Sequence, residues 1–254
     1  MTGEIAIYKK IEEFSLNAWP ALQSFVYDGW LLRFADGFTK RSNSVNPIYN
    51  GYEKSIPNKI RHCEDIYSSV GLDTIFKITP YVTSNHIDNL LDELGYIVVD
   101  PSSVKMLDLA NTEEPHKTTV TVSTDVNIEW LDQLACMNNL SESAKQTTWR
   151  LLSPSYVKKG FFTLFEGEVP VACGLGVVEQ NYIGLYDIVT DSSYRSQGYG
   201  RQLILNMLKW GKANGASHSY LQVVKSNRAA VSLYESLGYQ EVYTYWYRLK
   251  SRGD

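Results

Sequence analysis

A short loop with two glycines is the feature of this chain that most restricts its fold. The sequence SQGYG (196–200) lies between an apolar strand pattern, NYIGLYDIVTD (181–191), and an amphipathic helix pattern, RQLILNMLKWGKANG (201–215). The first turn of a helix carries unpaired backbone N–H groups and the positive end of the helix dipole. Glycines let a ligand approach those groups without meeting a side chain. The loop therefore predicts a strand–loop–helix unit that binds a phosphate-bearing ligand.

Two other phosphate-binding loops do not fit the sequence. A P-loop requires Gly-Lys-Ser/Thr, but Arg201 follows Gly200. A dinucleotide fingerprint requires G-x-G-x-x-G, but Gly174 and Gly176 are followed by Glu179 and lie within a strand pattern. The P-loop and the dinucleotide-binding fold are both excluded.

From residue 118 onward, the hydrophobic periodicity alternates between strands and helices. Helices are expected after N-caps at Ser141 and Asn227, and a hairpin turn is expected at 166–168. The predicted strands are 118–124, the hairpin within 161–178, 181–191, 219–226 and 239–249. The predicted helices are 128–140, 141–152, 201–215 and 227–238.

The N-terminal half repeats part of this order after an opening helix at 5–19. A helix (59–71), a strand (73–80), a helix (84–96) and one or two strands (97–109) follow. Ser84-Asn85 corresponds to Ser226-Asn227, and Leu94-Gly95-Tyr96 corresponds to Leu237-Gly238-Tyr239. This repeat predicts two related lobes, 1–112 and 118–254, joined by the polar linker 110–118. The alternative is that this element order is common and Leu-Gly-Tyr only ends a helix.

Composition limits the partners and the compartment. The formal net charge of −4 argues against a general nucleic-acid binder, which needs a concentrated basic surface. The three cysteines are widely spaced and form no C-x-x-C pair, so we expect reduced thiols, no zinc site and no other metal. The N-terminus lacks the apolar core of a signal peptide and no apolar run could span a bilayer, so we expect a cytoplasmic protein without a membrane partner. The sequence leaves the oligomeric state open.

Two motifs in register carry a resemblance to a known family. Arg195, Gly198 and Gly200 form R-x-x-G-x-G, and a second pattern follows one strand later at Asn227, Ala230, Leu233, Tyr234, Glu235, Gly238 and Tyr239. Over residues 118–249, the chain resembles the GCN5-related N-acetyltransferases, the GNAT superfamily. The resemblance implies an α/β fold with a mixed, mostly antiparallel sheet flanked by helices. The N-terminal half would be a related, partial and degenerate GNAT-like lobe.

The resemblance also implies a cosubstrate and the residues that bind it. The cosubstrate would be acetyl-CoA, from which the acetyl group passes directly to an amine in a ternary complex. Tyr234 would protonate the departing thiolate. The cofactor-binding positions would be Ile188, Val189 and Thr190 for the pantetheine arm, Arg195, Ser196, Gln197, Gly198, Tyr199, Gly200 and Arg201 for the pyrophosphate, and Asn227 at the helix cap. Each residue also has a simpler interpretation, as a surface charge, a helix cap or a packed aromatic ring.

The general base is not apparent from the sequence. In the N-terminal-amine acetyltransferases of ribosomal proteins, which this half resembles, a glutamate stands at the position of Gln222. A glutamine cannot take a proton from an ammonium group. Asp187, Glu179 or an ordered water are the alternatives, and both acids could equally face solvent.

The N-terminal half lacks the chemical motifs. The segment NPIYNGYEKSIPN (46–58) stands in place of the glycine loop and carries Pro57, while Leu91 stands where Tyr234 stands. We therefore expect one acetyl-CoA per chain. Its opening stretch (29–45) resembles the start of some two-lobed GNAT proteins, and its polar residues predict either a site facing the other lobe or a charged hairpin edge; they are Arg33, Lys40, Arg41, Asn43 and Ser44.

These observations favour an N-acetyltransferase that acts on a primary amine of a small molecule or a peptide N-terminus. Transfer of a longer acyl chain is a second enzymatic possibility. The alternative from another class is a non-catalytic protein that binds or senses acyl-CoA, which the missing glutamate favours and Tyr234 opposes.

Overall fold

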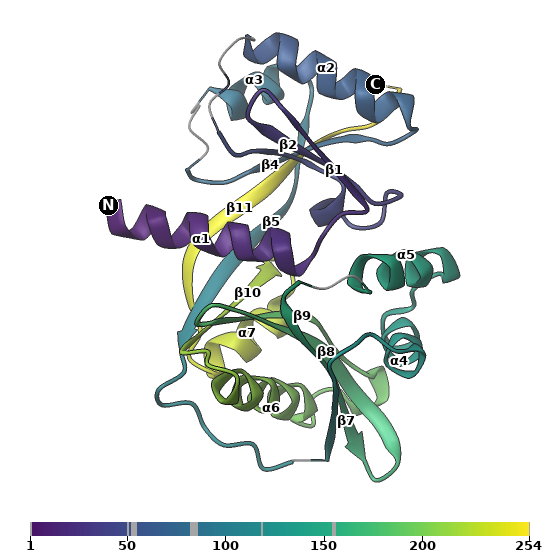
Figure 1. Cartoon of the computed structure of the whole chain (residues 1–254), viewed down its shortest axis with the longest axis vertical. Coiled ribbons are helices and arrows are strands. Elements are labelled where there is room, and N and C mark those ends of the chain that lie inside the picture. Colours follow the sequence, from purple (N-terminus) through teal and green to yellow (C-terminus); the bar gives the residue numbers. More distant parts are fainter. Residues whose placement is uncertain are drawn as a thin grey trace.

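A single sheet of eleven strands runs through the computed structural model, which describes residues 2–49, 51, 55–81, 86–117, 119–153 and 156–253 (Figure 1). The strand order is β1-β2-β3-β4-β11-β5-β10-β9-β8-β7-β6. The pairs β3–β4 and β9–β10 run parallel and the other pairs run antiparallel. Helices flank this sheet, so the predicted mixed, mostly antiparallel α/β fold is confirmed.

The first half of the chain supplies five strands and three helices. Proline at the start of α2 fits its position, because a residue in the first turn has no intrahelical acceptor for its N–H. The elements are α1 (Thr2–Ala18), β1 (Gln23–Tyr27), β2 (Trp30–Phe34), the 3₁₀ turn η1 (Lys40–Ser42), β3 (Val45–Pro47), α2 (Ile56–Ser69), β4 (Thr74–Ile78), α3 (Ile87–Glu93) and β5 (Ile97–Asp108).

The second half supplies the other six strands. Its helix caps are those expected, because Ser141 accepts a hydrogen bond from Ala144 N and Asn227 accepts one from Ala230 N. The elements are β6 (Val120–Ser123), α4 (Ile128–Asn138), α5 (Glu142–Leu152), β7 (Lys158–Glu166), β8 (Val169–Glu179), β9 (Tyr182–Thr190), the 3₁₀ turn η2 (Ser192–Tyr194), α6 (Tyr199–Ala213), β10 (His218–Val224), α7 (Arg228–Ser236) and β11 (Gln240–Lys250).

The two halves exchange their last strands at the centre of the sheet. β5, which ends the first half, pairs with β10, and β11, which ends the second half, pairs with β4. β5 and β11 also pair with each other. The C-terminus consequently lies beside α2, where Arg252 N donates to Asp73 Oδ1 at 2.9 Å (Figure 1). Each half is therefore completed by a strand of the other.

The ends of α3 and α7 share one geometry. Tyr96 N donates to Leu91 O at 2.9 Å, and Tyr239 N donates to Tyr234 O at 3.1 Å. The glycines before these tyrosines both adopt a positive φ, of 84° and 92°. Leu91 thus occupies the position that Tyr234 occupies in the second half. The pair Ser84-Asn85 lies outside the described residues, and the duplication and the boundary between 112 and 118 stay predictions.

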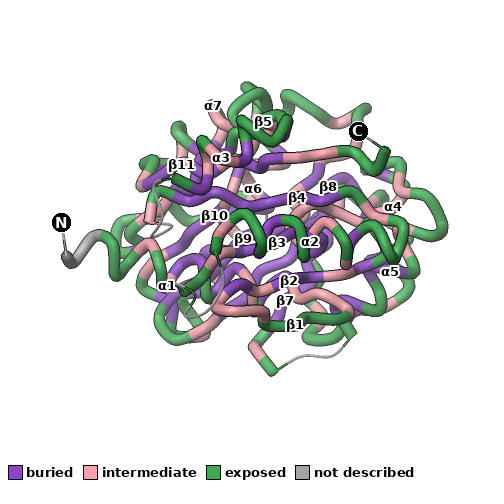
Figure 2. Tube along the Cα trace, turned by 90° about the horizontal axis from the view of Figure 1, so that it is seen from above, coloured by how far each residue is buried: buried purple, intermediate pink, exposed green. Residues whose placement is uncertain are grey.

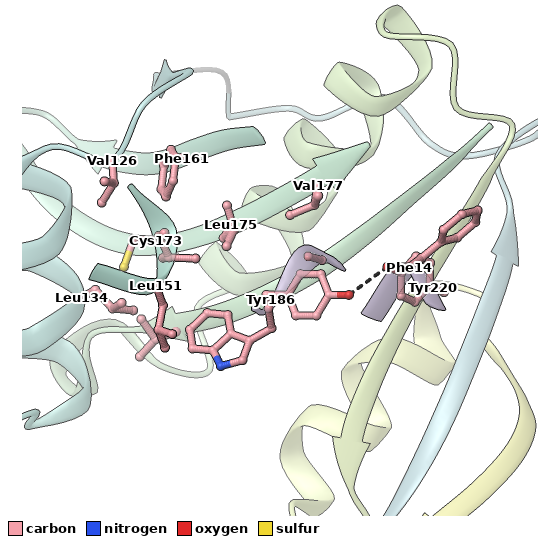
Figure 3. Close-up of a cluster of buried hydrophobic side chains, with 14 of the residues drawn as sticks. Phe14, Val126, Leu134, Leu151, Phe161, Cys173, Leu175, Val177, Tyr186 and Tyr220 are labelled. Atoms are coloured by element: carbon pink, nitrogen blue, oxygen red, sulfur yellow. Dashed lines mark hydrogen bonds between the residues drawn. The ribbon is translucent and has the colours of Figure 1, made fainter. Parts of the chain in front are cut away.

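Helices cover both faces of the second half of the sheet. Neighbouring residues of β7 point to opposite faces, so Phe161 packs with α4 and α5 while Phe162 packs with α6. α1 lies on the same face as α4, and its Phe14 packs beside Tyr220, which is hydrogen-bonded to Tyr186 (Figure 3). The strands are mostly buried, whereas the outer faces of the helices are exposed (Figure 2).

A buried ion pair and a hydrogen bond connect α1 to β4 of the first half and to the exchanged strand β11. Lys77 Nζ of β4 lies 2.5 Å from Glu12 Oε2, and Tyr243 of β11 donates to Glu12 Oε1 at 2.6 Å. Removing one partner of such a pair leaves an uncompensated buried charge, which is strongly destabilising. α1 is thereby fixed across the junction of the halves.

We predict that residues 1–112 and 118–254 do not fold independently, because each fragment loses the strand that pairs with its own core. Expressed apart, neither should unfold cooperatively when followed by near-UV circular dichroism. Co-expressed, they should co-purify as one complex and recover a cooperative transition. Independent cooperative unfolding of both fragments would contradict this prediction.

Candidate functional site

The site begins where β9 and β10 separate. These parallel strands pair from Tyr182 and His218 as far as Leu185 and Leu221, where the pairing ends. Just beyond, the register between β8 and β9 shifts, and Asp187 adopts a φ of 49°. A non-glycine residue in this region is uncommon and is often found at functional sites. The irregularity leaves the β10-facing edge of residues 188–190 without a strand partner, and we call this opening the fork.

The glycine loop closes one side of the fork. Ser196 and Gly198 both have a positive φ, of 59° and 84°, and α6 begins immediately afterward. A Cβ on Gly198 would meet no atom within 4 Å, so this glycine faces open space. A Cβ on Gly200 would lie 3.2 Å from Thr190 Oγ1, so this glycine allows α6 to pack closely against β9. The first turn of α6, whose N–H groups have no intrahelical acceptor, therefore lines the same pocket as residues 188–190 of the fork.

A pocket of about 530 Å³ lies between the fork, the glycine loop and α7. Eleven of the twelve predicted site residues line it, and the exception, Gln197, is exposed and donates to Ser193 O. Sequence reasoning missed Asn138, at the end of α4, Tyr194 and Ala229, for which no motif gives a signal. It named Ala230 and Leu233 only as motif positions. The lining residues are Asn138, Ile188, Val189, Thr190, Tyr194, Arg195, Ser196, Gly198, Tyr199, Gly200, Arg201, Asn227, Ala229, Ala230, Leu233 and Tyr234.

The two arginines at the rim are anchored by protein groups. Arg195 Nε donates to Thr190 O at 3.2 Å, which fixes the side chain across the end of β9. Arg201 pairs with Glu113 at 2.7 Å and donates to Ser236. The negative charge of Glu113 offsets part of the field of Arg201, so the backbone N–H groups are the better-placed anion donors.

Tyr234 projects from α7 into the same pocket. Its side chain is buried, and burial raises the pKa of the hydroxyl to about 12. The hydroxyl makes no hydrogen bond to any described residue, so it is a free proton donor at neutral pH. Asn227 caps the helix that carries it and holds α7 against the pocket.

The candidate bases lie in different surroundings. Gln222 is hydrogen-bonded at both ends of its amide, because its Nε2 donates to Ser15 Oγ at 3.0 Å and its Oε1 accepts from Tyr245 at 3.1 Å. Glu179 accepts hydrogen bonds from Asn17 near the β8–β9 turn. Asp187 lies five residues beyond Tyr182, the first residue of β9, which corresponds to about 17 Å along the strand. Asp187 adjoins Ile188 at the fork, and its Oδ2 is buried without a hydrogen-bond partner. Of the two acids, Asp187 is the one placed at the site.

The polar cluster of the first half is split by the structure. Arg33 has a structural role, since its guanidinium donates hydrogen bonds to the backbone carbonyls of Arg41, Leu16 and Trp19. Asn43 and Ser44 are buried, and the Asn43 side chain hydrogen-bonds the backbone of residues 35–39. Lys40 pairs with Asp100 at 2.8 Å.

Arg41 of this cluster lies against β9 of the second half, and its guanidinium is not taken up by backbone carbonyls as that of Arg33 is. Its Cζ lies 5.6 Å from the centre of the Tyr186 ring. The expectation of a polar site facing the other half therefore narrows to this one residue.

Metal and membrane features were also sought in the described ranges. There, no three His, Cys, Asp or Glu side chains are grouped so that they could hold a metal ion. None of the helices described combines the length and the apolar character needed to cross a bilayer.

A forked parallel pair, a glycine loop at a helix N-terminus and a tyrosine on the next helix define an acyltransferase of the GNAT superfamily, and comparisons agree with this class. A structure described as a GCN5-related N-acetyltransferase from Kribbella flavida superposes with a TM-score of 0.71, at 15% identity over 98% of this chain and 96% of that one. The family model described as "Probable histone acetyltransferase Rv0428c C-terminal" matches residues 2–248. The chain belongs to this family.

Two curated relatives are similar to this chain to different extents. The uncharacterised N-acetyltransferase YobR of Bacillus subtilis (strain 168) is 29% identical over 95% of this chain and 98% of its own length. The ribosomal protein bS18 alanine N-acetyltransferase of Escherichia coli (strain K12) is 40% identical over 57 residues, which are 22% of this chain and 38% of that enzyme. The first similarity spans both halves, whereas the second covers one segment.

We predict that Asp187→Asn stabilises the protein above pH 6 but not near pH 4. Burial raises the pKa of Asp187 to about 6 from 3.8, although Arg41 opposes the shift. Between these values the folded protein holds a proton that the unfolded chain releases, so the free energy of unfolding falls as the pH rises. The neutral asparagine, which tolerates a positive φ, avoids this loss of up to about 3 kcal/mol.

Urea denaturation of both proteins at pH 4 and pH 7.5 measures the difference. Other titrating groups are shared by the two proteins and cancel. A stability difference that is the same at both pH values would show that Asp187 is not held in a carboxylate-disfavouring environment.

Proposed function

We propose that this protein transfers an acetyl group from acetyl-CoA to a primary amine of a small molecule or a peptide N-terminus. One observation carries the proposal: the fork, the helix N-terminus and Tyr234 meet in one pocket. Each part supplies a different requirement of the reaction. The parts are a donor edge for the pantetheine arm, an anion site for the pyrophosphate and an acid for the leaving thiolate.

The glycine loop suits the pyrophosphate of acetyl-CoA. Ser196 and Gly198 turn successive N–H groups toward the pocket, and the first turn of α6 adds the positive end of its dipole. Gly198 leaves space on the pocket side for the phosphates. Arg195 and Arg201 would supplement the site from its rim.

The fork suits the pantetheine arm. Residues 188–190 pair with β8 on one edge only, so their remaining N–H and C=O groups can bind an extended amide chain as a further strand would. Such an arm would run from the glycine loop toward Asp187. The thioester would then lie between Tyr234 and Asp187.

The reaction is direct attack within a ternary complex. Asp187 takes a proton from the acceptor ammonium, and the free amine then attacks the thioester carbonyl. The tetrahedral intermediate collapses with cleavage of the C–S bond, and Tyr234 donates its proton to the departing thiolate. A base with a pKa of about 6 is ionised at neutral pH, and an acid with a pKa of about 12 is protonated, so both groups start in the required state.

One curated relative bears on the class of acceptor. The similarity to the bS18 alanine N-acetyltransferase favours a peptide N-terminus, but it covers 57 residues, which are 22% of this chain. Screening purified protein with acetyl-CoA against a panel of amines and N-terminal peptides, while following release of the CoA thiol, tests the proposal. Binding of acetyl-CoA without turnover of any amine would favour the alternative, a non-catalytic acyl-CoA sensor. A longer acyl donor that outcompetes acetyl-CoA would redefine the transferred group.

We predict that Gly198→Glu abolishes acetyl-CoA binding while the protein stays folded. The substitution places a carboxylate in the proposed pyrophosphate site. Gly95→Glu is the matched control, because Gly95 has the same φ of 84° and equally open space around its Cβ. Calorimetric titration should give one site per chain in the wild type and in Gly95→Glu, and none in Gly198→Glu.

The expected stoichiometry follows from the first half of the chain. Pro57 removes one N–H donor from the start of α2, and Leu91 replaces the tyrosine. A Cβ on Gly51 would lie 2.6 Å from Lys59 Nζ, so this glycine faces protein rather than open space. Two sites per chain, with one surviving Gly198→Glu, would show that the first half also binds the cosubstrate.

We predict that Tyr234→Phe lowers turnover by about 10²–10⁴-fold and leaves acetyl-CoA affinity nearly unchanged, because the hydroxyl acts only when charge develops on sulfur. Tyr239→Phe is not a suitable control, since the Tyr239 hydroxyl bonds Ser219 at 2.6 Å in the core. Tyr194→Phe tests a neighbouring pocket tyrosine instead. Steady-state kinetics with an identified amine decides it, and equal turnover of Tyr234→Phe and wild type would remove Tyr234 from the mechanism.

A further inference from the structure

Arg41 is a cation without an ion-pair partner among the described residues, and it lies beside Tyr186, the residue that precedes Asp187 at the fork. Its guanidinium lies against the Tyr186 ring, its Nε is buried without a hydrogen-bond partner, and it forms no ion pair with any described residue. A charged group in this position costs free energy unless something satisfies it. Burial disfavours the charge, but Tyr245, Tyr247, Tyr186 and Asp187 together raise the pKa of Arg41 above its ordinary value, so it remains a cation.

The charged side chains near Arg41 already have partners within the protein. Glu12 is paired with Lys77, Lys40 is paired with Asp100, and Arg33 is bound to backbone carbonyls. Among the described residues of this region, Arg41 and Asp187 are the charged groups that retain unsatisfied polar atoms. They belong to different halves, and Arg41 Cζ lies 5.6 Å from the ring centre of Tyr186, the residue that precedes Asp187.

We propose that the acceptor is a small amine that also carries a carboxylate, as amino acids do, with Arg41 binding the carboxylate and Asp187 receiving the ammonium group. This inference rests on the proposed function and names its substrate class. A zwitterionic ligand satisfies both orphaned groups at once and adds no net charge to the site. A neutral amine would leave the Arg41 guanidinium without an anion. A diamine would bring a second cation toward Arg41.

The proposal also assigns a role to the first half of the chain. η1 carries Arg41, and the turn is held by Asn43, which accepts from Ala35 N at 2.7 Å and donates to Phe38 O at 2.7 Å. Beneath it, Arg33 Nη1 donates to Arg41 O at 2.8 Å, which fixes the backbone of Arg41 itself. The guanidinium is therefore presented by a rigid turn, as a site for a small carboxylate requires.

The test uses matched substrates that share one amine skeleton: an amino acid, its primary amide and its decarboxylated amine. Full-length protein and acetyl-CoA are supplied, and kcat/KM is measured by release of the CoA thiol. We expect the carboxylate form to be preferred by about 30-fold or more, the effect typical of a buried charged contact. In Arg41→Gln, kcat/KM should fall for the amino acid and stay unchanged for the amide and the decarboxylated amine, so that the preference is lost. The affinity for acetyl-CoA should be unchanged.

Two variants separate recognition from folding. Lys40→Gln removes the adjacent cation, which is already paired with Asp100, and should keep the preference. Arg41→Lys retains the charge without the planar guanidinium and its several N–H donors, and it should keep part of the preference. Equal use of the amide and the acid by the wild type, or an equal loss for all substrates in Arg41→Gln, would overturn the proposal.

Failure of the proposed function can be told apart from failure of this inference. If no amine is acetylated, calorimetry of the same three compounds with the wild type and Arg41→Gln, each saturated with CoA, still reports recognition. Binding of the acid to the wild type but not to Arg41→Gln supports the carboxylate site without catalysis. Binding of the acid and the amide with equal affinity would show that Arg41 recognises no carboxylate.

Discussion

The exchange of β5 and β11 is the constraint on which the rest of this structure depends. Two halves that each kept their last strand could separate or pack in several orientations. Here each half is completed by the other, and β5 and β11 pair along the centre of the sheet. The relative position of the halves is therefore fixed by backbone hydrogen bonds, and α1 is held over the junction by the Glu12–Lys77 pair. This fixed arrangement holds Arg41 of the first half against Tyr186 of the second, as the proposed carboxylate site requires.

At the fork, two locally unfavourable features coincide at the residue that we propose as the general base. Asp187 combines a positive φ with a buried, unpaired carboxylate oxygen, and each feature is unfavourable for a folded chain. The surrounding strands are otherwise well paired, so the cost is tolerated. The same irregularity opens β9 toward β10 and raises the pKa of the carboxyl into the range of a useful base. One local distortion thus accounts for both the shape and the protonation of the site.

The local structure was predictable because it is encoded by nearby residues. Periodicity predicted the strands and helices, Ser141 and Asn227 predicted helix starts, and the glycine loop predicted a ligand site at the start of α6. Strand partners were not predictable, since β5 suits either neighbour by its own pattern. The positive φ of Asp187 was also hidden, because an aspartate within an apolar strand reads as an ordinary solvent-facing residue.

Arg41 shows most clearly why long-range features escape sequence reasoning. Five polar residues of the first half looked equivalent, and the structure separates them by what they touch. Arg33 and Asn43 bond the backbone, Lys40 pairs with Asp100, and Arg41 reaches Tyr186, 145 positions away. The donor side of the pocket is built mainly from backbone groups and one tyrosine, which impose little choice of acceptor. The side chain of the first half that we propose to select the acceptor is Arg41, which lies against Tyr186. Under the proposed carboxylate site, the first half, in which Leu91 stands at the position of Tyr234, would help to select the amine that the second half acetylates.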